Sequence, residues 1–132
     1  MTHPAGSRMG ARVRRHRDQR GAATAEMAMV LPMLVAVTVG LVWLLAVGSA
    51  QVRAVDAARE TARAVARGDD VAAAVARGEE VAPPGSRVRV ETGSGEVRVV
   101  VTGRVAGPGG LFEIPHAVVS AEAVAVQEGS GQ

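Results

Sequence analysis

The residues with the clearest chemical potential are a glycine and a lone carboxylate that follows it by five positions. Gly21 precedes Ala22, and Glu26 is the only charged residue between Gly21 and Ala50. A carboxylate at the start of an apolar helix is costly in a membrane unless a partner neutralises it. Cleavage after Gly21 would create a free amine on Ala22, close in sequence to Glu26. The spacing therefore predicts a processing site that produces the partner of Glu26.

The segment that follows Glu26 is long enough to cross a membrane. Residues 27–50 comprise 24 residues without a charge. At about 1.5 Å per residue, such a helix covers a hydrocarbon core of ~30 Å with some tilt. Pro32 removes a backbone donor within it and predicts a kink. We expect a transmembrane helix over residues 22–50.

The positive charge of the chain is concentrated before this helix. Residues 1–21 contain one acid, Asp18, and six arginines: Arg8, Arg12, Arg14, Arg15, Arg17 and Arg20. This leader predicts a cytoplasmic amino terminus and an exported carboxyl-terminal part. Its removal would take away a net charge of +5 and leave a mature chain of −3. A basic segment can also bind nucleic acid, but this one directly precedes a span and contains no aromatic residue, which argues against that function.

Two other export signals fit less well. The small residues Gly48 and Ser49 could precede a signal peptidase site near Ala50, but the apolar run is longer than a usual signal-peptide core. The pair Arg14-Arg15 is typical of twin-arginine signals, yet the residues after it, HRDQ, do not fit such a signal. Both alternatives are therefore less favoured than cleavage after Gly21.

The sequence after the span predicts a small α+β domain. Residues 51–67 continue the helix with an apolar stripe, and Gly68 ends it; the stripe comprises Val52, Val55, Ala58, Ala62 and Val65. A second helix is expected over residues 71–77, capped by Asp69 or Asp70 and closed by Gly78, so that helices occupy residues 51–78.

A change to period two in the following residues predicts strands. Residues 87–91 and 96–101 alternate around the turn 92–95, which indicates a hairpin with its valines inward, and Val100 breaks the alternation. Residues 116–127 form a third strand candidate on which Glu122 shares a face with valines. The sheet region covers residues 79–128, and residues 129–132 form a disordered tail. We expect one long helix packed on an antiparallel sheet of about three strands.

Patterns of catalysis or of metal and cofactor binding are not found. The chain contains no cysteine, and His116, beside a proline, is the only histidine after Gly21. The pairs Asp69-Asp70 and Glu79-Glu80 are more typical of helix caps and solvated charge than of a cation site. The GPGG stretch at 107–110 has no phosphate-binding lysine and indicates a turn. We therefore expect a protein without enzymatic activity.

The stretches ATAEMAMVLPMLV and QVRAVDAARETARAVARGD resemble TadE-like minor pilins or pseudopilins of tight-adherence (Flp-type IV) pili, and more narrowly their actinobacterial branch. The resemblance covers residues 20 to about 104. It implies cleavage between Gly21 and Ala22 by a membrane-bound prepilin peptidase, with Glu26 and Pro32 as assembly residues. It also implies an assembly platform driven by a cytoplasmic ATPase, and co-assembly with a major Flp-type pilin and other minor pilins.

Two departures from the major pilins point to a minor component. Major Flp pilins usually carry tyrosine after the glutamate, whereas Met27 follows Glu26 here, and they lack a sheet domain. The function predicted is a structural subunit of a pilus, its initiation complex or a related secretion pseudopilus. The alternative is a single-pass, signal-anchored membrane protein whose exported domain binds a partner without polymerising. The residues leave open whether Glu26 meets its own Ala22 amine or that of a neighbour.

Overall fold

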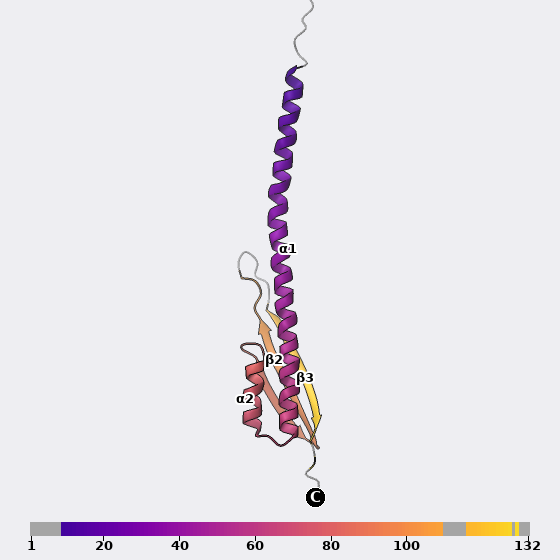
Figure 1. The fold of residues 1–132 in the computed structure, drawn as a ribbon, viewed down its shortest axis with the longest axis vertical. Helices are drawn as coiled ribbons and strands as arrows, with labels where there is room; N and C mark the ends of the chain where they lie inside the picture. The colour runs from indigo at the N-terminus through magenta and orange to yellow at the C-terminus, as the bar shows by residue number, and fades with distance from the viewer. Residues whose placement is uncertain (1–8, 110–115, 128, 130–132) are drawn as a thin grey trace, which may run out of the picture. The chain divides into compact units, whose positions relative to one another are not determined.

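A computed structural model describes residues 9–109, 116–127 and 129, with side chains from residue 21 onward. The chain forms two helices and three strands: α1 (Met9–Ala66), α2 (Val71–Val81), β1 (Arg87–Gly93), β2 (Glu96–Val105) and β3 (Ala117–Val126) (Figure 1). The predicted α+β class is confirmed. Contacts divide the chain into two units, Met1–Val39 and Gly40–Gln132, which are described separately. Of the predicted tail, only Gly129 is among the described residues.

In the first unit, the described residues all belong to α1. The helix begins at Met9, inside the arginine-rich leader and upstream of the helix expected over residues 22–50. Ala, Arg, Gln and Met are good helix formers, and residues 9–31 contain no proline, so the helix of the span extends backward into the leader. The helix also continues through Pro32. The kink expected at Pro32 stays a prediction.

In the second unit, α1 presents a stripe of small residues to the core. Its buried residues are Ala50, Ala54, Ala57, Ala58, Thr61, Ala62, Ala64, Val65 and Ala66. The predicted stripe was wrong at Val52, whose side chain is 61% exposed. Alanine lets the helix axis approach the sheet closely, so the stripe of smallest side chains, rather than the valine at position 52, faces the core.

The end of α1 is a Schellman motif. Gly68 has a φ of 91°, its N–H donates to the Val65 carbonyl, and the N–H of Asp69 donates to the Ala64 carbonyl. These bonds satisfy carbonyl groups that the helix leaves unpaired. The predicted stop at Gly68 is confirmed.

Helix α2 is longer than predicted, because it runs through Gly78 and ends at Val81. Asp70 is its N-cap, with its carboxylate accepting a hydrogen bond of 2.9 Å from the N–H of Ala73. Gly78 was expected to close the helix as a conformational breaker. Instead it is buried against α1, where a Cβ at position 78 would lie 2.2 Å from Thr61 Oγ1.

The strands form an antiparallel sheet in the order β1-β2-β3. The two-residue turn Ser94-Gly95 joins β1 to β2 with φ of 55° and 80°, the positive values that a tight hairpin turn of matching twist requires. The hairpin and the third strand are confirmed. Val97, Val99 and Val101 are fully buried, and Val119 of β3 is 2% exposed.

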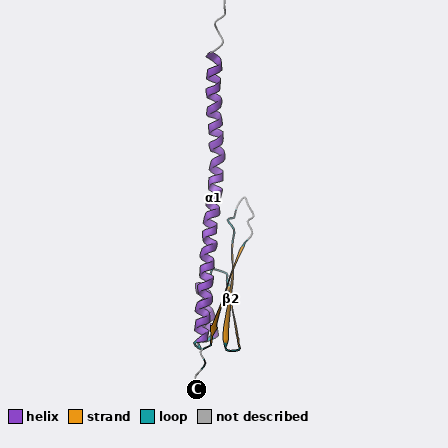
Figure 2. Cartoon of the chain, turned by 90° about the vertical axis from the view of Figure 1, so that its right-hand side faces the viewer, coloured by secondary structure: helices purple, strands orange, loops and turns teal. Residues whose placement is uncertain are grey.

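The second unit has two layers. The carboxyl-terminal part of α1 and α2 lie on one face of the sheet, as the side view shows (Figure 2). The valines of β2 pack on the alanines of α1 in one cluster. Each buried valine contributes about 1.5–3 kcal/mol relative to exposure. The other face of the sheet carries mainly charged side chains and exposed valines.

Candidate functional site

The predicted processing and assembly residues lie on consecutive turns of α1. Gly21, Ala22, Glu26 and Pro32 are all helical and exposed. Apart from its two chain neighbours and the adjacent backbone of its own helix, no described atom lies within 4 Å of the place where a Cβ on Gly21 would sit. The Gly21–Ala22 peptide bond is therefore uncovered by other described side chains, although a peptidase would have to unwind the helix locally to cleave it.

Helical geometry places Glu26 beside the amine that cleavage would release. Ala22 and Glu26 are four residues apart on α1, a separation of about 6 Å along the axis, and they share one face. A glutamate side chain in a helix leans toward the amino terminus, here toward Ala22. The carboxylate can therefore reach an amine on its own chain as well as one on a neighbouring helix.

The arginines proposed to set the membrane orientation lie outside the residues whose side chains are described. Five of them lie in the part of α1 whose backbone is described: Arg12, Arg14, Arg15, Arg17 and Arg20. Arg8 precedes α1 in the sequence. Their role stays a prediction from the charge pattern.

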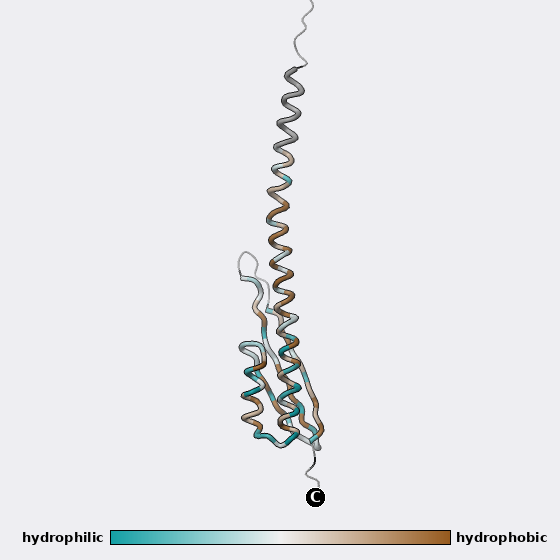
Figure 3. The backbone as a smooth tube through the Cα atoms, in the orientation of Figure 1, coloured by the Kyte–Doolittle hydropathy of each residue, from teal (hydrophilic) through white to brown (hydrophobic). Residues whose placement is uncertain are grey.

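The helix that carries these residues has the length and composition of a membrane span. The backbone of α1 is coloured brown over this apolar stretch in Figure 3, and the mean hydropathy is 2.6 over its most apolar part. None of that window is buried within the chain. Met27, Met29 and Leu31 expose 63–79% of their surface. The helix is thus compatible with a single-pass membrane protein.

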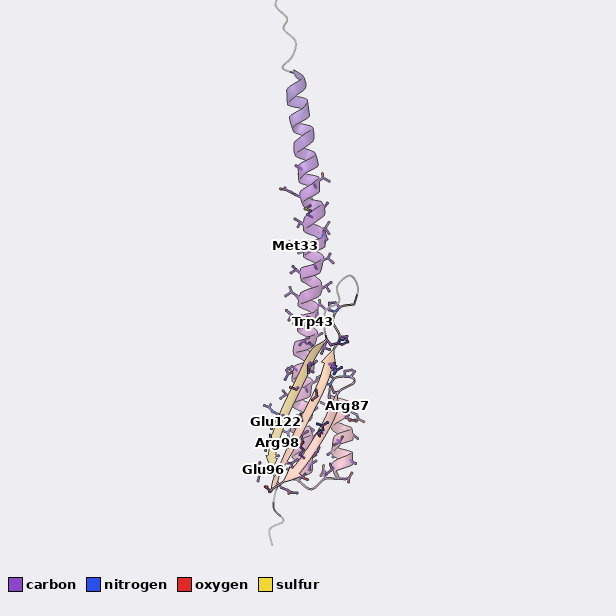
Figure 4. All side chains as sticks on the ribbon, turned by 180° about the vertical axis from the view of Figure 1, so that it is seen from behind. Met33, Trp43, Arg87, Glu96, Arg98 and Glu122 are labelled. Carbon is purple, nitrogen blue, oxygen red and sulfur yellow. The ribbon has the colours of Figure 1, made fainter. Side chains whose placement is uncertain are left out.

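Several charged residues after the span cap a helix or pair with one another. Asp70 caps α2, and Asp69 pairs with Arg77 at 2.8 Å. Arg98 of β2 and Glu122 of β3 form an ion pair on the outer face of the sheet (Figure 4). Val100, opposite Glu122 in the ladder, lies on that same outer face.

The remaining candidates for chemistry are dispersed. His116 is exposed just before β3. Within the part of the chain that the structure describes, no three His, Cys, Asp or Glu side chains gather where they could hold a metal ion. The arrangement that remains is one apolar helix with a single carboxylate near its start and a small folded domain at its other end.

Comparison with known families bears on this helix. Residues 21–63 match the family model described as TadE-like protein. This segment is similar to TadE-like proteins. The match begins at Gly21 and covers about a third of the chain. No curated protein and no solved structure matches the chain. The TadE-like family is a structural, pilus-associated family, and the assignment to its actinobacterial branch stays a prediction.

Side-chain contacts that the sequence analysis missed hold the TadE-like segment to the sheet. Trp43 donates its indole N–H to the carbonyl of Ala106 at 3.1 Å, and Gln51 donates its amide to the carbonyl of Ser120 at 2.8 Å. Trp43 falls within residues 22–50, the predicted transmembrane helix. Periodicity gives no signal for such bonds, because each joins residues more than sixty positions apart.

Proposed function

We propose that the chain is a minor pilin or pseudopilin of a Tad-type pilus system, processed after Gly21 and assembled through its apolar helix. The family match carries this proposal, because the matched segment starts at Gly21 and contains Ala22, Glu26 and Pro32. The match begins one residue before the proposed cut, so it covers the start of the proposed mature chain and almost none of the leader.

The chemistry of assembly follows from the exposed helix. A charged side chain costs about 2.5–3.5 kcal/mol at the centre of a bilayer and less near its edge, where the lone carboxylate of Glu26 would lie. The Ala22 amine would offset that cost after cleavage. Exposed side chains over residues 27–45 would then pack against other subunits, with Gly40 allowing close approach.

The partners and the location follow from the same proposal. A prepilin peptidase would act on the cytoplasmic side, where the arginines hold the leader. The processed chain would then meet an assembly platform driven by a cytoplasmic ATPase. It would assemble there with a major Flp-type pilin and other minor pilins. The folded domain would be extracytoplasmic and contribute priming, tip or adhesive contacts. The chain itself would have no enzymatic activity.

The intact mass of the membrane-extracted protein tests the proposal. Cells with the prepilin peptidase should yield a chain that starts at Ala22, and cells without it should yield the full chain. A full-length mass in peptidase-competent cells would instead favour a signal-anchored protein whose exported domain binds a partner without polymerising.

A further inference from the structure

A hollow lies between α1 and the end of β2, within the second unit. It has a volume of about 340 Å³ and is lined by Ser49 and Arg53 of the helix, by Pro84, and by Arg104 and Ala106 at the end of β2. Cavities of this size are of the order that small ligands and headgroups occupy. Arg53 and Arg104 are exposed, and neither forms an ion pair with a side chain that the structure describes.

The surroundings of the hollow change sharply along the helix. On its amino-terminal side, Leu41, Leu44 and Leu45 expose 57–74% of their surface. These leucines line an apolar groove on α1 with Gly48 and Ser49. Trp43, labelled in Figure 4, lies between Leu41 and Leu44 in the sequence and is half-buried. Its indole N–H donates to the carbonyl of Ala106 at the rim of the hollow.

This order of side chains matches the layers of a membrane surface. Exposed leucines suit hydrocarbon, and tryptophan suits the interface, where its ring is apolar and its N–H finds an acceptor. Guanidinium groups suit the phosphate level, because their fork of donors binds phosphate oxygens in pairs. Along α1, Trp43 lies within the last turns of exposed leucines, and Arg53 follows them toward the carboxyl terminus; Arg104 reaches the same hollow from the end of β2.

We infer that this hollow binds the phosphate headgroup of an anionic phospholipid, through Arg53 and Arg104, and marks where α1 leaves the membrane. The inference rests on the proposal that α1 crosses a membrane. A core of ~30 Å needs about 20 residues of helix. A boundary just after Leu45, with Trp43 in the interface, therefore moves the span to roughly residues 25–45 and places Glu26 at the opposite edge of the core.

The sole tryptophan of the chain allows a direct test. The full-length chain is reconstituted in vesicles of phosphatidylcholine and phosphatidylglycerol, in which one or the other lipid carries bromine, a short-range quencher of Trp43 fluorescence. Brominated phosphatidylglycerol should quench Trp43 more strongly than its mole fraction in the vesicle predicts. The local enrichment of this lipid should be about fivefold for each guanidinium group that binds it. Bromines near the lipid carbonyls should quench more than bromines near the chain ends.

Two double variants separate this site from general positive charge. Arg53→Gln with Arg104→Gln should abolish the preference for phosphatidylglycerol. Arg87→Gln with Arg89→Gln removes the same charge from exposed positions on β1 and should leave the preference intact. Equal quenching by both lipids, or an equal loss in the control variant, would overturn the headgroup site and leave the membrane span standing.

The remaining outcomes are also decisive. If inorganic phosphate in the buffer removes the preference, the hollow binds a free anion rather than a lipid, and the inference is wrong. Stronger quenching by bromines near the lipid chain ends would place Trp43 in the hydrocarbon core and overturn the proposed membrane boundary. Quenching by neither lipid would also contradict the proposal that α1 crosses the membrane. The assay uses the uncleaved chain, so failure of processing or of pilus assembly would not affect its result.

Discussion

Thr61 on α1 occupies the space that a side chain at Gly78 on α2 would need. A Cβ at position 78 would lie 2.2 Å from Thr61 Oγ1, closer than real Cβ contacts come. Gly78 and Thr61 are both buried, with Thr61 1% exposed. The two helices therefore meet at a glycine, and this contact sets how closely α2 packs beside the carboxyl-terminal part of α1.

The first prediction concerns this contact. Gly78→Ala should lower the free energy of unfolding by about 1–3 kcal/mol through overpacking, although alanine favours a helix by about 1 kcal/mol. Thermal unfolding of the detergent-solubilised chain, followed by circular dichroism, measures the change. Gly48→Ala is the matched control, because it lies in α1 where the added methyl meets nothing within 4 Å beyond its chain neighbours and the adjacent helix backbone, and it should be neutral or stabilising.

A double variant shows whether Thr61 is the cause. Thr61→Ala removes the obstructing side chain, so Gly78→Ala should cost at least about 1 kcal/mol less in that background. Strict additivity of the two changes would mean that something other than Thr61 resists a side chain at position 78.

The second prediction concerns the hydroxyl of Thr61. Its Oγ1 is buried and has no hydrogen-bond partner among the described residues. An unsatisfied buried hydroxyl costs about 1–3 kcal/mol, and an apolar group of the same shape avoids that cost. Thr61→Val should therefore be neutral or stabilising by up to about 1 kcal/mol in the same assay. Thr102→Val, on the exposed face of β2, serves as the control. Destabilisation by Thr61→Val alone would show that the hydroxyl has a partner after all.

The Gly78 contact also shows where prediction from the sequence ended. The hairpin, the third strand and the stop at Gly68 follow from local patterns: alternating valines, turn residues, and a glycine after a helical repeat. Gly78 gives the same local signal as Gly68, yet only Gly68 has a positive φ. The two glycines differ in their surroundings. Gly78 packs against Thr61, a residue distant in sequence, so a small residue is required there for helix packing rather than for a turn.

The candidate site divides in the same way. The sequence alone identifies the candidate processing and assembly residues, because they are defined by short spacings along one helix: Gly21, Ala22, Glu26 and Pro32. The bond from Trp43 to Ala106 and the hollow between Arg53 and Arg104 depend on how the end of β2 meets α1. No spacing rule connects these residues, since the register of the sheet on the helix is set by the packing of valines on alanines.

The third prediction concerns the start of α2. Asp70→Ala removes the acceptor of the Ala73 N–H and should cost about 1 kcal/mol, whereas Asp70→Ser keeps a capping oxygen and should recover most of that loss. Asp56→Ala changes the same charge at an exposed position inside α1 and should stay within about 0.5 kcal/mol of the parent chain. If the alanine and serine variants at position 70 unfold alike, the cap contributes nothing measurable.

The fourth prediction separates recognition by the peptidase from folding. Gly21→Ala adds a methyl that meets no described atom within 4 Å beyond its chain neighbours and the adjacent helix backbone, so the chain should fold as before while cleavage falls. Gly40→Ala adds a methyl to the same helix, also without a near neighbour, and should be cleaved normally. Intact mass of the membrane fraction measures the cleaved share. Equal cleavage of the two variants would mean that Gly21 is not the residue recognised.

The last prediction concerns the carboxylate of Glu26, which we propose to act after cleavage rather than in it. Glu26→Gln keeps the shape of the side chain but removes its charge, so cleavage should continue while fewer fibres are recovered by shearing from the cells. Glu26→Asp keeps the charge on a shorter arm and should restore assembly in part, because the Ala22 amine lies one helical turn away. Immunodetection in the sheared fraction measures assembly, and intact mass measures cleavage in the same cells. Normal fibre yield from Glu26→Gln would remove the pairing of Glu26 with Ala22, and reduced cleavage in that variant would place the carboxylate in peptidase recognition instead.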